Sequence, residues 1–200
     1  MLRFLAILFI ACLSFIQSFS QENTQQKVLP ELCLSQTEMI LLKLINEYRV
    51  EQGLPTIKLS ASLCYVARTH AVDQTAHHEY GSRCNLHSWS ASSKWSSCCY
   101  TPDHKQAQCM WDKPRELTNY KGNGYEIAFY STFKYDTPET FARDILNGWK
   151  HSPGHNDVIL SRNVFKNAVW KAIGIGVHGE YADVWFGKDE DTEKMPKGCE

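Results

Sequence analysis

The 200-residue sequence predicts an α+β fold in which helices cover a small antiparallel β-sheet. Two observations carry this prediction. Apolar residues recur with helical spacing in three segments, and they alternate with small or polar residues in the last segment before the tail. The order of elements is then helix, helix, long excursion, strand, helix and hairpin. This order suits layers of helices packed on one sheet.

Residues 1–20 are typical of a secretory signal peptide. Arg3 precedes the apolar run FLAILFIACLSF, and the small residues Ser18 and Ser20 follow it. The run is too short to span a bilayer, which takes about 20 residues, and the sequence predicts no transmembrane segment elsewhere. We therefore expect a secreted, extracellular protein with residues 21–34 as a leader. A buried N-terminal strand or helix is the alternative.

Two helices are predicted next. Ser35 and Glu38 form a capping box, and the helix behind them should end at about Gln52. Ser60 is placed to cap a second helix that ends at about His78. One face of this second helix contains small and apolar residues that permit close packing, together with two polar ones: Leu63, Ala67, His70, Ala71 and Gln74.

The excursion at residues 80–122 has no persistent helical or alternating period. Removal of Cys12 with the signal peptide leaves seven of the eight cysteines, and four of the seven lie in this excursion. In an oxidising compartment we expect most of them to form disulfides. The adjacent Cys98 and Cys99 suit two separate bridges better than one metal ion. Because seven is odd, one thiol is free or pairs between chains. Three tryptophans would pack against the disulfides or line a groove: Trp89, Trp95 and Trp111.

The segment GWKHSPGHND raises a question about zinc, because His151 and His155 have the spacing of two ligands on one helical face. Pro153 lies between them and disfavours helical geometry at the residue before it. The helix that Thr137 opens should therefore end near His151, and His155 should begin a new segment. His151 would then meet the free carbonyl groups at the C-terminal end of the helix.

The remaining elements are strands. YEIAFYS, residues 125–131, is the first, and a hairpin follows in WKAIGIGVHG and ADVWFG. In the hairpin, isoleucine and valine face one side, while Gly174 and Gly176 face the other. The glycine side would let another backbone come close. The charged tail beyond this hairpin has few apolar residues, so we expect it to be solvated and mobile up to Cys199.

The charge of the chain argues against nucleic acid as a partner. The formal net charge is −1, and it falls to about −2 when Arg3 leaves with the signal peptide. The sequence contains no basic patch or run, which nucleic-acid-binding domains need to meet phosphate.

Four motifs resemble those of the CAP family (cysteine-rich secretory, antigen 5 and pathogenesis-related-1 proteins, or SCP domain). INEYRVEQGLPTIKLSASLCYVARTHA resembles the family's opening, and GYEIAF is similar to its G-E-N-[IL]-A element. WKHSPGHNDVIL is similar to the W-x-x-S-P-G-H-x-x-x-[IL]-L form, and IGIGVHGEYADVWFG to the closing hairpin. The resemblance implies a three-layer α-β-α sandwich with a cleft. It places the domain at residues 35–188, the disulfide-rich insertion at about 80–122 and the charged tail at 189–200.

The resemblance also implies a cleft with two histidines and two acidic residues. His155 lies in the matching G-H motif, Glu126 lies in the strand motif, and His87 in CNLHSWS best matches the first histidine. The second acid has no counterpart after Trp149. His87 and His155 are the candidate zinc ligands through neutral imidazole nitrogens. Glu126 would orient one imidazole or act as a base on bound water. The alternative is a buried polar network that binds no metal, and His70 is expected to be a hydrogen-bonded core histidine rather than a ligand.

No pattern of nucleophile, base and orienting residue appears in the sequence. We therefore expect a secreted, non-enzymatic binding module, and the resemblance implies an extracellular protein, a sterol or other lipid, or a divalent metal as its ligand. A zinc-dependent hydrolase that uses His87, His155 and Glu126 is the alternative. A secreted structural or toxin-like protein with an inert cleft is a third possibility.

Overall fold

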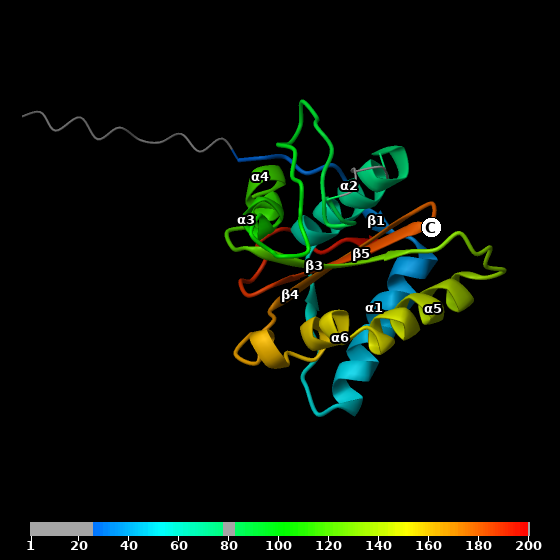
Figure 1. The fold of residues 1–200 in the computed structure, drawn as a ribbon. Helices are drawn as coiled ribbons and strands as arrows, with labels where there is room; N and C mark the ends of the chain where they lie inside the picture. Colours follow the sequence, from blue (N-terminus) through cyan, green and yellow to red (C-terminus); the bar gives the residue numbers. More distant parts are fainter. Residues whose placement is uncertain (1–25, 78–82, 200) are drawn as a thin grey trace, which may run out of the picture.

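The computed structural model describes residues 26–77 and 83–199 (Figure 1). The predicted signal peptide lies outside the described residues. Helices cover both faces of a central sheet, which confirms the α+β layers. One layer contains α2 (Ala61–His77), α3 (Ala107–Trp111) and α4 (Lys113–Leu117), and the other contains α1 (Gln36–Glu51), α5 (Pro138–His151) and α6 (Pro153–Ile159). Within the described ranges, no helix has the length and apolar character needed to cross a membrane.

The central sheet has four strands in the order β2-β4-β5-β3. The antiparallel strands are β3 (Gly124–Tyr130), β4 (Ala172–His178) and β5 (Tyr181–Gly187), and β2 (Lys58–Leu59) pairs in parallel with β4. The predicted antiparallel sheet is confirmed for β3, β4 and β5, and the parallel strand β2 at its edge was not predicted. A two-residue strand pairs through its backbone alone and leaves no alternation in the sequence.

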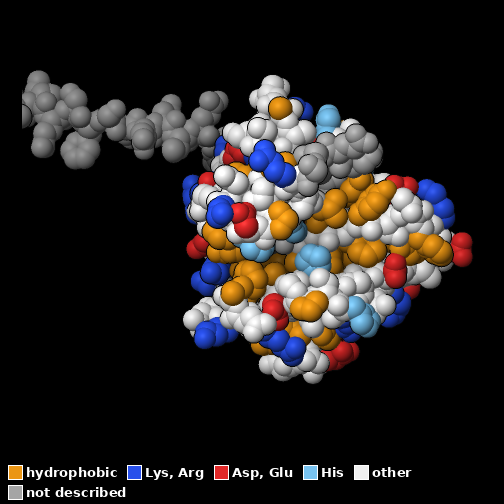
Figure 2. Space-filling model, viewed as in Figure 1, with side chains coloured by type: hydrophobic (Ala, Val, Ile, Leu, Met, Phe, Trp, Pro, Cys, Tyr) orange, Lys and Arg blue, Asp and Glu red, His pale blue; other side chains and the backbone are white. Residues whose placement is uncertain are grey.

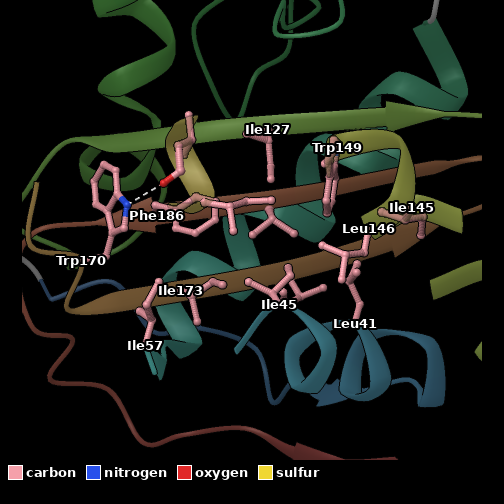
Figure 3. Close-up of a cluster of buried hydrophobic side chains, with 14 of the residues drawn as sticks. Leu41, Ile45, Ile57, Ile127, Ile145, Leu146, Trp149, Trp170, Ile173 and Phe186 are labelled. Atoms are coloured by element: carbon pink, nitrogen blue, oxygen red, sulfur yellow. Dashed lines mark hydrogen bonds between the residues drawn. The ribbon is translucent and has the colours of Figure 1, made fainter. Parts of the chain in front are cut away.

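The core on the α1 and α5 side is formed by the apolar stripes of these helices and by one face of the sheet (Figure 3). Ile45 and Trp149 are buried, and the sheet contributes Ile173. The Trp170 indole donates to the carbonyl of Val158 in α6 across 2.8 Å. This bond holds α6 against the sheet and so fixes the segment that carries His155.

The opposite face of β4 lies directly against α2. A Cβ atom on Gly174 would lie 2.1 Å from the carbonyl carbon of Leu63, and one on Gly176 would lie 2.2 Å from the amide nitrogen of Arg68. Both distances are far below van der Waals contact. The prediction that the glycine side admits another backbone is confirmed, and it explains how α2 brings its side chains down to the sheet.

The helix starts predicted from capping residues are also confirmed. Ser35 and Glu38 form the capping box of α1, and the Ser60 hydroxyl accepts from the amide of Leu63 at the start of α2. The predicted end of α1 at about Gln52 is also confirmed, since α1 ends at Glu51 with Gln52 as its C-cap, and α2 is described to His77.

The excursion is ordered by two disulfides, Cys84–Cys99 and Cys98–Cys109. Cys98 and Cys99 thus belong to separate bridges, as predicted. The excursion also contains α3 and α4, which the sequence did not reveal, because five-residue helices are too short to show a period. Trp89 and Cys98 are buried and pair through an antiparallel bridge. Trp89, Cys98 and Cys109 also belong to one cluster of packed side chains, which confirms the predicted packing of this tryptophan against the disulfides.

The tail is largely exposed, as expected, but it is attached to the domain at several points. Cys199 forms a disulfide with Cys33, and β6 (Lys197–Gly198) pairs with β1 (Cys33–Leu34). The Asp191 carboxylate accepts from the amide of Ser62 across 2.8 Å. The expectation of a mobile tail was therefore wrong. Its sequence shows charge but not the partners elsewhere in the chain that hold it.

Candidate functional site

The candidate site lies where β3 passes between the two helical layers. Figure 2 shows histidine side chains along a hollow that crosses this face and is bordered by hydrophobic side chains. Glu126 of β3 faces the α2 layer, and its side chain is fully buried. His87 reaches it from the excursion, and His155 comes from α6. The structure thus brings together all three residues proposed from the sequence.

The position of His155 follows from the break between α5 and α6. The helix ends at His151, Ser152 is extended with φ −101° and ψ 109°, and a new helix begins at Pro153. His155 lies in the first turn of this new helix, so it does not share a helical face with His151. The two residues therefore cannot form the H-x-x-x-H zinc site, as predicted.

His151 has the role expected at a helix end. Its ring nitrogen Nδ1 lies 2.8 Å from the carbonyl oxygen of Asn147, which belongs to the last turn of α5, and the side chain is exposed. This bond holds the ring against the last turn of its own helix. His151 therefore contributes to the helix and not to the cleft.

Glu126 is the centre of the cluster. Its Oε1 lies 2.5 Å from Nδ1 of His70, and its Oε2 lies 2.9 Å from Nδ1 of His87. Desolvation by burial would raise the pKa of Glu126, but the charge of His70 and the hydrogen bonds from both histidines outweigh it and lower the pKa to about 2. Glu126 is therefore ionised across the physiological range.

His70 is a cluster member that the sequence analysis did not propose. Its Nε2 lies 2.8 Å from the carbonyl oxygen of Ser88, and its ring stacks on Trp89 with centroids 4.3 Å apart. Desolvation would lower the pKa of His70, but the charges of Glu126 and Asp183 outweigh it and raise the pKa to about 9. His70 is thus an imidazolium that donates from both nitrogens. The expectation of a hydrogen-bonded core histidine is confirmed, although its partner is the site carboxylate.

Asp183 of β5 is the second residue that the sequence analysis missed. It is fully buried, and its Oδ1 lies 3.9 Å from Nδ1 of His70 and 3.3 Å from the side-chain nitrogen Nε2 of Gln74. Desolvation and the charge of Glu126 raise the pKa of Asp183 well above its ordinary value. The sequence did contain an indication, because the alternation in YADVWFG places this carboxylate on the same face as Trp185, which is buried.

The imidazole of His155 has no hydrogen-bond partner within the described ranges. Its ring centroid lies 6.4 Å from that of His87, and the ring planes meet at 71°. Desolvation and the charge of His87 lower the pKa of His155 to about 4. Its imidazole is therefore neutral at physiological pH and keeps a free lone pair. Because Nδ1 of His87 faces Glu126, Nε2 of His87 is the other nitrogen able to hold a metal ion.

Comparison with known proteins gives one family and several similar structures. The model of the cysteine-rich secretory protein family, CAP, matches residues 42–183. An extracellular protein containing a SCP domain from Bacillus anthracis is 18% identical, with a TM-score of 0.51, and the match covers 76% of this chain. This likeness shows the fold. Comparison with curated protein sequences gives no significant match.

Two further solved structures are similar at a lower score. A cysteine-rich secretory protein from Staphylococcus aureus is 17% identical with a TM-score of 0.48, and the match covers 76% of this chain. An outer surface protein from Borrelia burgdorferi is 16% identical with a TM-score of 0.49, and the match covers 77% of this chain and 93% of that one. The chain spans only 38% of the Staphylococcus aureus structure and 40% of the Bacillus anthracis structure.

Proposed function

The chain belongs to the CAP family of cysteine-rich secretory proteins, and from this premise we propose that it is a secreted binding module whose cleft holds a divalent metal ion between His87 and His155. The metal ion would form part of the surface that an extracellular partner recognises. Residues 1–20 would direct secretion and be removed. Three disulfides within the described residues suit such an oxidising compartment.

The free imidazole of His155 is the observation that carries this proposal. The imidazole of His155 is half-buried and forms no hydrogen bond with the described residues, so its nitrogens remain available to a ligand. Its lowered pKa keeps the ring neutral, and the neutral form is the one that binds metals. His87 lies across the cleft with Nε2 available, because Glu126 holds Nδ1.

The residues present fit a zinc-like ion. Two imidazoles on one tetrahedral zinc ion have ring centroids about 5 Å apart when each Zn–N bond is about 2.0–2.1 Å. The observed separation of 6.4 Å therefore needs only a small side-chain adjustment. Glu126 supplies the carboxylate that commonly orients a metal-binding histidine from behind. A zinc ion held by two protein ligands would keep open positions for a donor from the partner.

The hydrolase alternative has weaker support. A general base must exchange a proton near the operating pH, so its pKa should lie near neutrality. Glu126 accepts from both His70 and His87, and its pKa is lowered to about 2. A carboxylate stabilised in this way is a poor base for activating water. Binding without catalysis is therefore the function that the geometry favours.

The charged surface between α1 and α5 favours a protein partner over a lipid acyl chain. A hollow of about 580 Å³ lies between α1 and α5, in the helical layer that also contains α6, and offers room for an extended ligand. Half of its lining residues are charged: Glu47, Glu51, Arg143, Asp144 and Lys150. Such a lining suits a polar protein surface, because burying charges against a hydrocarbon chain would be costly.

The experiment is zinc titration of the secreted, untagged chain by calorimetry. The His155→Ala variant should lose at least tenfold in zinc affinity at the cleft, because it removes one of two protein ligands. His151→Ala is the matched control, since this nearby histidine is exposed and bonded to its own helix. Equal zinc binding by the wild type and the His155→Ala variant would contradict the proposal. Equal losses in the two variants would contradict it as well.

A further inference from the structure

A second group of metal-ligating side chains lies beneath the cleft, on the side of the sheet that α2 covers. One ligand atom from each of His70, Glu126 and Asp183 can be chosen so that all three lie within 4.8 Å of one another. We propose that these three residues form an inner site for a zinc-like divalent cation, separate from the His87 and His155 pair. The inner site shares Glu126 with the proposed outer site, but it does not require a metal ion there.

His70 has the geometry of a metal ligand held from behind. Its Nε2 donates to the carbonyl oxygen of Ser88, and its ring lies flat on Trp89 with an interplanar angle of 5°. These contacts fix the ring so that Nδ1 points at Glu126 and Asp183. Metal-binding histidines commonly donate their other N–H to a carbonyl or carboxylate in this way, which fixes both the tautomer and the ring orientation.

Unpaired acceptors give an independent indication of a cation. Oδ2 of Asp183 and Oε1 of Gln74 are buried and have no hydrogen-bond partner within the described ranges. The side-chain nitrogen Nε2 of Gln74 already donates to the carbonyl of Leu86 and lies 3.3 Å from Oδ1 of Asp183. Buried acceptors without donors are costly and rare. A cation beside Asp183 would bind the carboxylate oxygen directly and leave the Gln74 carbonyl near a positive charge.

The charges of the cluster also match a divalent ion. Glu126 and Asp183 are two carboxylates in a desolvated interior, with one imidazole between them. With the imidazole neutral and both carboxylates ionised, the three side chains carry two negative charges, which one divalent cation would balance. One nitrogen and two carboxylate oxygens are a ligand set that zinc accepts.

The two sites can be separated by counting bound metal. Zinc would be measured by mass spectrometry after dialysis of the secreted, untagged chain against the metal. We expect two zinc ions in the wild type, one in Asp183→Asn, one in His155→Ala and none in the double variant. Asn keeps the shape of Asp and can replace its protonated form, so Asp183→Asn should fold. Circular dichroism would verify the fold.

Each result assigns the sites separately. Loss of one zinc ion in Asp183→Asn, together with a zinc ion that persists in His155→Ala, supports the inner site even if the proposed cleft site fails. A full wild-type count in Asp183→Asn overturns the inner site and leaves the cleft proposal standing. A metal-free wild type overturns both.

A second measurement does not depend on the Asp183 variant. Zinc should raise the unfolding temperature of His155→Ala, because the inner site remains intact and binds only the folded chain. An unfolding temperature that zinc does not change would overturn the inner site.

Discussion

His70 and Glu126 form a buried ion pair, with Nδ1 and Oε1 2.5 Å apart and both side chains fully inaccessible to solvent. The two residues are 56 positions apart in the sequence, one on α2 and the other on β3. A pair of this kind connects the helical layer to the sheet at the floor of the cleft. Breaking a buried pair by removing one partner leaves an uncompensated charge and typically costs about 3–5 kcal/mol.

The first prediction concerns alkaline pH. The pKa of His70 is raised to about 9 in the folded chain, against about 6.5 in an unfolded one. Between these two pKa values the folded state holds a proton that the unfolded state has lost. The contribution of His70 to the free energy of unfolding is therefore fully present below pH ~6.5 and is lost as the pH rises to about 9. Urea denaturation should show a fall on the order of 1–3 kcal/mol over this range, and His70→Gln should remove the slope.

His155 provides a control at acid pH, because its pKa is shifted in the opposite direction to that of His70. Its pKa is lowered to about 4 in the folded chain, so the unfolded state binds the proton first as the pH falls. This contribution is present above pH ~6.5 and is lost as the pH falls to about 4. His155→Ala should flatten the acid side of the curve and leave the alkaline side unchanged. If His155→Ala also removed the alkaline slope, the assignment to His70 would be wrong.

The second prediction concerns the contact between α2 and β4. Gly176→Ala would place a methyl group 2.2 Å from the amide nitrogen of Arg68, where only backbone atoms could move away. We expect a loss of about 3 kcal/mol or more in the free energy of unfolding, since overpacking costs typically 1–3 kcal/mol even where side chains can shift. Chemical denaturation followed by circular dichroism measures it.

Gly154→Ala is the matched control, because no atom within 4 Å would meet its Cβ and the residue lies in α6. Alanine has a higher helix propensity than glycine, so this variant should gain about 0.5–1 kcal/mol. A Gly176→Ala variant as stable as Gly154→Ala would show that α2 does not rest on the glycine face in solution.

Local chemistry explains which parts of the fold were predictable. Ser35 and Thr137 mark helix starts because a capping side chain acts on the next three residues, and Pro153 marks the end of α5 because its ring restricts the residue before it. The alternation around Ile175 shows a strand with two different faces. The two-residue strands β2 and β6 leave no such pattern, because backbone pairing with a distant segment defines them.

The residues of the candidate site were likewise predictable where a local motif marks them, but not where packing between distant segments places them. The family resemblance proposed His87, Glu126 and His155, and the structure places them together. The alternation in YADVWFG indicates that Asp183 is buried, but the positions of His70 and Asp183 beside Glu126 depend on how α2, β3 and β5 pack, which no local pattern encodes. A histidine on an apolar helical face looks like a core residue in the sequence, and here it is one as well as a partner of the cleft carboxylate.

The third prediction concerns the odd cysteine. Cys64 is the free cysteine among the described residues, and it is buried in α2. Desolvation raises the pKa of its thiol to about 12, so the reactive thiolate is scarce at neutral pH. An aromatic disulfide reagent should label no thiol in the folded, mature chain and one thiol in denaturant. Labelling of the folded chain, or a dimer that a reductant dissolves, would contradict this and support pairing between chains.

The last prediction concerns the attachment of the tail. The Asp191 carboxylate accepts from the Ser62 amide across 2.8 Å and from the Ser62 and Ser60 hydroxyls across 2.9 and 2.6 Å, so a residue about 130 positions away caps the start of α2. Removal of a helix cap typically costs about 1 kcal/mol, up to about 2. Asp191→Ala should lower the free energy of unfolding by this amount, whereas Asp191→Asn should lose less, because its amide oxygen still accepts. Glu190→Ala is the control for charge, since Glu190 is exposed next to it. Equal losses in Asp191→Ala and Glu190→Ala would assign the effect to tail charge rather than to capping, and the urea midpoints of the three variants decide between them.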